Sequence, residues 1–224
     1  MAMSVVDSNP LRRAQTRAEI LADSCVHAFG VVAAIGGSAI LVVSASAEGG
    51  VGKISSVVVY ALGLLAMFTA SAAYNLCYAT SWRGVLRRCD HAAIFLMIAG
   101  TYTPFTTQLH VGASAALITV AIWATSLAGV LLKFRAPELF ERIPVWLYLG
   151  LGWASVAVLA PLVERLSLHV FAAVVLGGSL YTIGVAFHCW ERLKYQNAIW
   201  HVFVLSAAAV HYVAILRGVV LTGV

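Results

Sequence analysis

Charged residues are scarce in this sequence: Asp, Glu, Lys and Arg account for 10% of its 224 residues, against about 25% in soluble domains. Hydrophobic residues make up 62% of the chain, and a soluble fold of this length could not cover them with so few charges. The first 20 residues are polar and basic and lack an apolar stretch, so we expect no cleavable signal peptide. The net charge of +5 lies in short clusters between apolar runs, which indicates a membrane protein and not a nucleic-acid-binding one.

Seven apolar runs are long enough to cross a membrane, which takes about 20 mostly apolar residues. Pro104 lies late in the third run and predicts a kink there. The predicted fold class is therefore an all-α, seven-transmembrane helix bundle over residues 22–216, with an N-terminal segment 1–21 and a C-terminal tail 217–224. The expected spans are about 22–46, 54–80, 90–109, 113–132, 144–161, 166–188 and 197–216.

The distribution of Lys and Arg predicts the orientation of these spans. Eleven of the 14 basic residues lie before the first run or in the loops after the second, fourth and sixth. Because cytoplasmic loops carry the excess of Lys and Arg, we expect the N-terminus inside and the C-terminus outside. A multi-pass protein of the inner (plasma) membrane follows, with membrane lipids as its partners. The four cysteines contain no Cys-x-x-Cys pair, and we interpret them as reduced, buried residues in helix ends near the cytoplasmic face.

Polar side chains collect near the predicted cytoplasmic ends of four helices. An ionisable group inside a span costs about 2.5–3.5 kcal/mol on insertion scales, so each is a functional candidate. Spacings of four residues place several of these groups on common helix faces. They predict one polar cavity, open to the cytoplasm and lined by Glu19, Asp23, His27, Ser71, Asn75, Asp90, His91, Asn197 and His201.

Each of these residues also has a simpler interpretation. Glu19 and Asp23 suit a helix N-terminus through the macrodipole, and His27 could be an interfacial histidine with a backbone partner. Asp90 and Asn197 could cap their helices, and Ser71 could bond a carbonyl of its own helix. The convergence of the whole set favours the cavity.

The last helix and the second helix together could present three inward ligands, which with a water is the pattern of a catalytic zinc site. Asp90 could then orient the metal-bound water or act as a base. Two of the three ligand positions are Asn75 and Asn197, however, and a neutral amide oxygen is a poor zinc ligand beside an imidazole. The residue chemistry therefore favours a hydrated polar cavity over a tight zinc site. The alternative is a cluster that recruits Asp23, His27, Asp90 and His201.

These residues lie in motifs that resemble the hemolysin III branch of the progestin and adipoQ receptor superfamily, which includes the adiponectin receptors. Residues 89–105 resemble its third-helix signature, and residues 71–75 resemble a second-helix motif that normally ends in His. Residues 19–27 resemble the first-helix signature, with Asp23 where Asn is usual, and residues 197–204 resemble a last-helix motif that normally begins with His. The similarity extends over about residues 19–211.

The resemblance implies seven helices, a cytoplasmic N-terminus and a cavity that opens to the cytoplasm. It places the zinc ligands of the family at Asn75, Asn197 and His201, so only one of three histidines is present. Ser71 and Asp90 occupy the positions of the supporting serine and acid. The resemblance also implies activities: zinc-dependent lipid amide hydrolysis in the receptor branch, and haemolysis, pore formation or membrane lipid homeostasis in the bacterial branch.

Three functions follow as hypotheses. The first is a protein of membrane or lipid homeostasis, built on a hydrolase-like scaffold with a depleted metal site. The second is a metal-dependent hydrolase of lipid amide bonds, in which Asp90 positions the metal-bound water, Ser71 supports a ligand and His201 is the remaining ligand. The third is a pore-forming cytolysin, which is less favoured because the polar groups stop near the inner leaflet.

Overall fold

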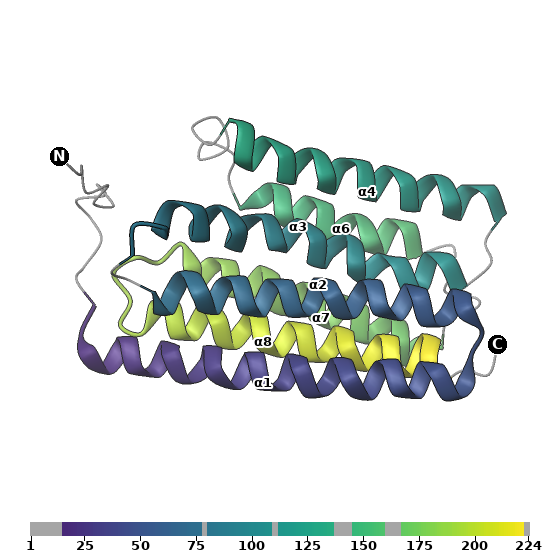
Figure 1. Ribbon diagram of the computed structural model, residues 1–224, viewed down its shortest axis with the longest axis horizontal. Helices are drawn as coiled ribbons and strands as arrows, with labels where there is room; N and C mark the ends of the chain where they lie inside the picture. Colours follow the sequence, from purple (N-terminus) through teal and green to yellow (C-terminus); the bar gives the residue numbers. More distant parts are fainter. Residues whose placement is uncertain (1–14, 78–79, 109–111, 137–144, 160–166, 222–224) are drawn as a thin grey trace.

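The computed structural model describes residues 15–77, 80–108, 112–136, 145–159 and 167–221, and all regular structure in these residues is helical. Successive helices run in alternate directions along a common long axis (Figure 1). The predicted all-α bundle is confirmed for these residues. In chain order the helices are α1 (Arg17–Glu48), α2 (Val51–Leu76), α3 (Arg83–Gln108), α4 (Gly112–Arg135), α6 (Trp146–Leu159), α7 (Leu168–His188) and α8 (Gln196–Ile215), followed by the π-helical turn η2 (Leu216–Val220).

Within the described residues, five helices are long and apolar enough to cross a membrane: α1, α2, α4, α7 and α8 with η2, at mean hydropathies of 1.9 to 2.1. The chain is therefore a multi-pass membrane protein. Helix α3 has more polar side chains than these five, and α6 has only 14 residues; the expected end near residue 161 lies outside the described residues. The count of seven spans and their orientation stay predictions.

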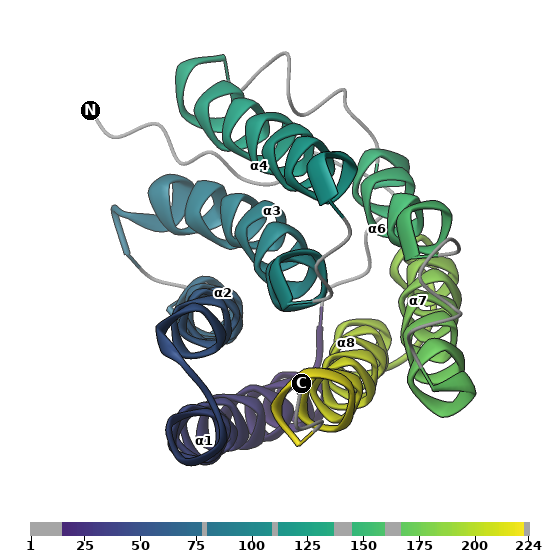
Figure 2. The same cartoon turned by 90° about the vertical axis from the view of Figure 1, so that its right-hand side faces the viewer.

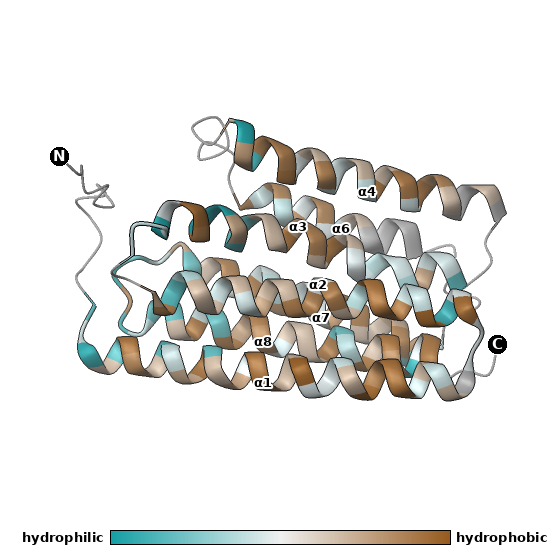
Figure 3. Cartoon of the chain, in the orientation of Figure 1, coloured by the Kyte–Doolittle hydropathy of each residue, from teal (hydrophilic) through white to brown (hydrophobic). Residues whose placement is uncertain are grey.

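Hydrophobic residues run along most of the length of the helices (Figure 3), and many of the large ones are exposed. On α1, Phe29 is 65% exposed, Val32 is 70% exposed and Ile40 is 59% exposed. A monomeric soluble protein rarely exposes so continuous an apolar surface, whereas lipid chains solvate it well. The polar side chains Asp23 and His27 of α1 are buried, so they face the interior of the bundle.

Seen from one end, α1, α2, α3, α6, α7 and α8 follow one another around the bundle, and α4 packs outside against α3 (Figure 2). The first and last helices of this ring, α1 and α8, are in contact. The main apolar core lies towards the C-terminal end of α1, away from the polar residues of its first turns. Its most buried members include Leu41, Tyr60, Phe105, Ile215 and Val220.

Helices α2 and α3 approach each other closely at two glycines. A Cβ atom on Gly63 would lie 3.1 Å from the carbonyl oxygen of Leu96, and one on Gly100 would lie 3.3 Å from that of Val59. Small residues at such crossings let helix backbones pack closely in a membrane, where the hydrophobic effect does not drive helices together. This contact fixes the positions of α2 and α3, the helices that carry Ser71 and Asp90.

Two helices begin earlier than the apolar runs suggest, which corrects two of the simpler interpretations. Helix α3 begins at Arg83, so Asp90 is inside the helix and does not cap it. The N-cap of α8 is Tyr195, so Asn197 does not cap that helix either. Basic and polar residues can extend a helix beyond its apolar part, and the apolar run therefore marks the span and not the helix end.

The start of α1 explains Glu19. The Thr16 backbone N–H and hydroxyl donate to Glu19 Oε2 at 2.8 and 2.9 Å, and the Thr16 hydroxyl oxygen accepts from the Glu19 N–H at 3.3 Å. This capping box starts the helix at Arg17 and not near residue 22. The other carboxylate oxygen of Glu19 accepts from the backbone N–H of Tyr195 at 2.9 Å, so one side chain holds the beginnings of both α1 and α8.

The cysteines differ from their interpretation as buried residues. Cys25, Cys77 and Cys189 are exposed, Cys89 is half-buried, and none of them forms a disulfide. Pro104 lies inside α3, which continues through it to Gln108.

The glycine contact between α2 and α3 predicts the effect of a substitution. Gly63→Leu should destabilise the protein by about 1–3 kcal/mol, because the added atoms force the two backbones apart. Unfolding of the purified protein in mixed detergent micelles by increasing SDS measures this change. Gly36→Leu is the matched control, since a Cβ on Gly36 meets nothing within 4 Å. Equal stabilities of the two variants would show that this close approach does not hold α2 on α3.

Candidate functional site

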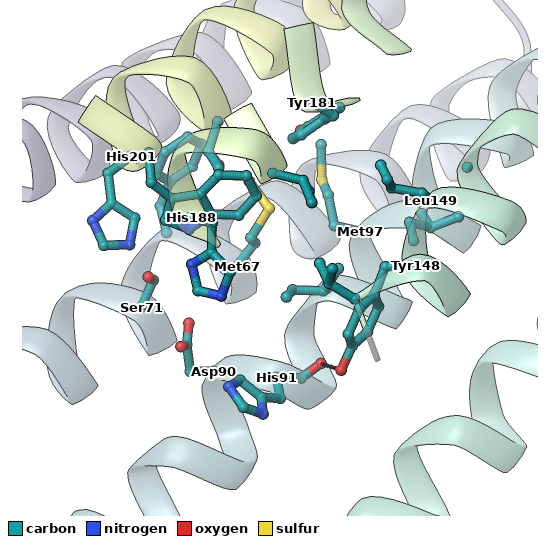
Figure 4. A pocket seen from close by; sticks show the side chains of 18 of the residues that line it. Met67, Ser71, Asp90, His91, Met97, Tyr148, Leu149, Tyr181, His188 and His201 are labelled. Carbon is teal, nitrogen blue, oxygen red and sulfur yellow. Dashed lines mark hydrogen bonds between the residues drawn. The ribbon is translucent and has the colours of Figure 1, made fainter. Parts of the chain in front are cut away.

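A cavity of about 540 Å³ lies between α1, α2, α3, α6, α7 and α8. This volume is within the range of pockets that hold small ligands. The character of its wall changes along the bundle. Polar side chains line it beside the first turns of α3 and α8, and apolar side chains such as Met67, Met97 and Leu149 line it further in (Figure 4).

The structure brings seven of the nine predicted site residues into this one cavity, from four helices. Glu19 and Asp23 do not line the cavity. Glu19 caps α1, and Asp23 is buried beside His27 and His201. The seven residues in the wall are His27, Ser71, Asn75, Asp90, His91, Asn197 and His201.

Asp90 points into the polar end of the cavity towards Ser71 and His201 (Figure 4). Ser71 lies next to the Asp90 carboxylate (Figure 4). Lys133, at the end of α4, also lines the cavity, is only 3% exposed and interacts electrostatically with Asp90. A buried carboxylate requires such partners, because desolvation of an unpaired charge is costly.

The sequence reasoning missed Lys133 and Tyr148. The sequence indicated Lys133 only as a charged loop residue, because the apolar run ends at residue 132. The helix in fact continues to Arg135. Tyr148 on α6 lies beside Asp90 and donates to the backbone carbonyl of His91 at 3.4 Å (Figure 4). The sequence around a tyrosine in an apolar helix does not predict which residue of another helix it will contact.

Asn75 is held on its own helix. Its amide Nδ2 donates to the Ser71 carbonyl oxygen at 2.9 Å and approaches the Ser71 hydroxyl oxygen at 3.4 Å. With two neutral amides among its three members, the set Asn75, Asn197 and His201 does not fit zinc, which prefers imidazole, thiolate and carboxylate ligands.

A different set of donors comes together between α1 and α8. Asp23 Oδ1 lies 2.6 Å from His201 Nδ1, and Asp23 Oδ2 lies 3.7 Å from His27 Nε2. The rings of His27 and His201 have centroids 4.2 Å apart. One ligand atom from each of Asp23, His27 and His201 lies within 4.8 Å of the others. Of the four residues considered for an alternative cluster, three therefore form a group without Asp90.

This group is well shielded from solvent: Asp23 is 2% exposed, His27 is 3% exposed, and the His201 side chain is 13% exposed. Asp23 Oδ2 and His27 Nε2 are buried and have no hydrogen-bond partner among the described residues. The interpretation of His27 as an interfacial histidine with a backbone partner is therefore wrong. Two unpartnered polar atoms that face each other are unusual in a protein interior.

The other histidines lie apart from this group. His211 Nε2 is 3.2 Å from the Val174 carbonyl oxygen on α7 and so makes a separate contact between helices. His169 is exposed at the start of α7, and His110 lies outside the described residues.

Comparison with known proteins agrees with these motifs. The model of the family "Haemolysin-III related" matches residues 18–212. The chain is 30% identical to Hemolysin-3 of Bacillus cereus over 205 residues, which cover 92% of this chain and 94% of that protein. It is 30% identical to a Hemolysin-3 homolog of Bacillus subtilis (strain 168) over 198 residues, covering 88% and 93%. It is also 30% identical to the monocyte to macrophage differentiation factor of Homo sapiens over 208 residues, covering 89% and 84%. A match over nearly the whole length, from the first helix motif to the last, makes this chain a member of the haemolysin-III related family.

Proposed function

We propose that this protein binds a membrane lipid in its cavity and acts in membrane lipid homeostasis. We place it in the inner (plasma) membrane as seven spans, with the N-terminus in the cytoplasm and the C-terminus outside. The split of basic residues supports this orientation, since it puts the polar end of the cavity at the cytoplasmic face. The alternating helix directions are compatible with it (Figure 1).

The observation that carries the proposal is the two-sided character of the cavity. Its polar end offers the Asp90 carboxylate and the buried Lys133 ammonium, which suit a zwitterionic or hydrogen-bonding headgroup. From His201 the wall extends to His211, ten residues and so about 15 Å further along α8. Met67 and Met97 lie along this stretch, and flexible thioether side chains adapt well to an acyl chain.

A steric block tests whether the cavity holds a lipid. Met97→Trp should reduce the binding of a spin-labelled or fluorescent lysolipid about tenfold or more, because the indole fills the apolar part of the cavity. Leu62→Trp is the control, since Leu62 is 61% exposed on α2 and faces outwards. Native mass spectrometry of both purified variants measures the bound lipid. Equal occupancy in the two would contradict lipid binding in this cavity.

The second candidate is a metal-dependent hydrolase of lipid amide bonds. The contact between Ser71 and Asp90 beside His201 favours it, because such groups could position a water molecule. The unsuitable donors at Asn75 and Asn197 oppose it, and for that reason we place homeostasis first.

Turnover of a short-chain ceramide separates these two functions. We expect no Asp90-dependent release of fatty acid by the wild-type protein, and an altered membrane lipid composition in cells that express Asp90→Ala. The paired variant Asn75→His, Asn197→His restores three imidazoles and tests whether the scaffold can support the hydrolysis. Hydrolysis by the wild-type protein that is lost in Asp90→Ala would favour the enzyme and contradict our order.

A pore-forming role is the third candidate. The core beyond the cavity is closed by residues such as Tyr60, Phe105 and Ile215, which supports a cavity that does not continue as a pore in the described residues. We expect liposomes that contain the purified protein to retain a trapped dye. Rapid leakage that depends on the protein would favour the pore.

A further inference from the structure

We propose that Asp23, His27 and His201 bind a divalent transition-metal ion between α1 and α8. This site and the set Asn75, Asn197 and His201 have His201 in common, but the other two donors of this site come from α1. It does not depend on the lipid-binding role, because an ion could hold these helices whether or not the cavity binds a lipid.

The spacing of the donor atoms suits an ion. Two ligand atoms that each lie about 2.0–2.2 Å from a tetrahedral zinc ion are about 3.4 Å apart. Asp23 Oδ2 and His27 Nε2 are 3.7 Å apart, which is close to this value and too long for a hydrogen bond. One donor atom of His201 also lies within 4.8 Å of both partners. Rotation of the three side chains would bring their donor atoms to a common ion.

The two unpartnered atoms supply an independent reason to expect a ligand. A buried polar atom without a hydrogen bond is unfavourable, and here two such atoms, 3.7 Å apart, belong to Asp23 and His27, each at most 3% exposed. A metal ion would satisfy both at once. Glu19, one turn earlier on α1, does not compete for this role, because its oxygens accept from Thr16 and Tyr195.

The donor chemistry selects the class of ion. Two imidazoles and one carboxylate suit zinc or another first-row transition metal, whereas calcium and magnesium prefer oxygen donors alone. His27 and His201 line the cavity and Asp23 lies behind them, so a remaining coordination position would face the cavity. A water molecule or the polar part of a cavity ligand could occupy that position.

Cobalt titration of the purified full-length protein in detergent tests the site. After removal of metals with a chelator, Co²⁺ should bind at one ion per chain, give visible d–d bands of a site with nitrogen and oxygen ligands, and be displaced by Zn²⁺. Asp23→Asn, His27→Gln and His201→Gln should each weaken Co²⁺ binding about tenfold or more, since even loss of an outer partner of a ligand costs about 10–100-fold. Asn75→Ala, Asn197→Ala and His169→Gln should bind as the wild type does, and the last controls for surface histidines.

Thermal unfolding guards against a variant that does not fold. Zn²⁺ should raise the Tm of the wild type and of His169→Gln and should leave the Tm of Asp23→Asn unchanged. Asn has nearly the shape of Asp, so Asp23→Asn should preserve the fold of the metal-free protein. A protein that binds no Co²⁺, or that binds it equally well as Asp23→Asn and His27→Gln, overturns the proposal. Loss of binding in Asn75→Ala and Asn197→Ala with full binding in Asp23→Asn would also overturn it and place the ion at the other positions.

Discussion

The contact between Asp23 and His201 is the interaction on which the arrangement of this protein depends. It joins α1 to α8, the first and last helices of the bundle, through a 2.6 Å separation of Asp23 Oδ1 and His201 Nδ1. A carboxylate that is 2% exposed cannot remain without a partner, so this pair fixes the rotation of each helix about its axis. Glu19 repeats the link one turn earlier by accepting from the Tyr195 N–H. Because α1 and α8 both form walls of the cavity, its shape follows from these two contacts.

The bundle separates polar and apolar functions along its length. Asp23, His27, Asp90, His201 and the buried Lys133 lie towards one end, and the tightly packed core with Tyr60 and Ile215 lies towards the other. The glycine contact holds α2, which carries Ser71, against α3, which carries Asp90. A cavity that is charged at one end and apolar further in can distinguish the two parts of an amphiphile, and this property underlies the lipid role that we propose.

The sequence predicted the helices well because apolar runs are the strongest signal of a membrane span, and the four-residue spacing of Asp23 and His27 placed both on one face. It placed seven polar residues of the cavity wall for the same reason. It failed where helices extend beyond their apolar parts: Asp90 is inside α3, and Lys133 belongs to α4 and not to a loop. The sequence could not predict which candidate metal ligands come together, because the spacing of residues along one helix does not say which other helix packs against it. The group of Asp23, His27 and His201 depends on α1 lying beside α8, a contact between residues 178 positions apart.

The position of the metal is the most direct measure of this account. Anomalous diffraction from crystals of the zinc-loaded protein, recorded above and below the zinc absorption edge, would locate the ion without any substitution. The account predicts one peak between Asp23 Oδ2 and His27 Nε2, within bonding distance of His201, at the side of the cavity next to α1. A peak beside Asn75 and Asn197, or no peak near Asp23 in a crystal that contains zinc elsewhere, would contradict it.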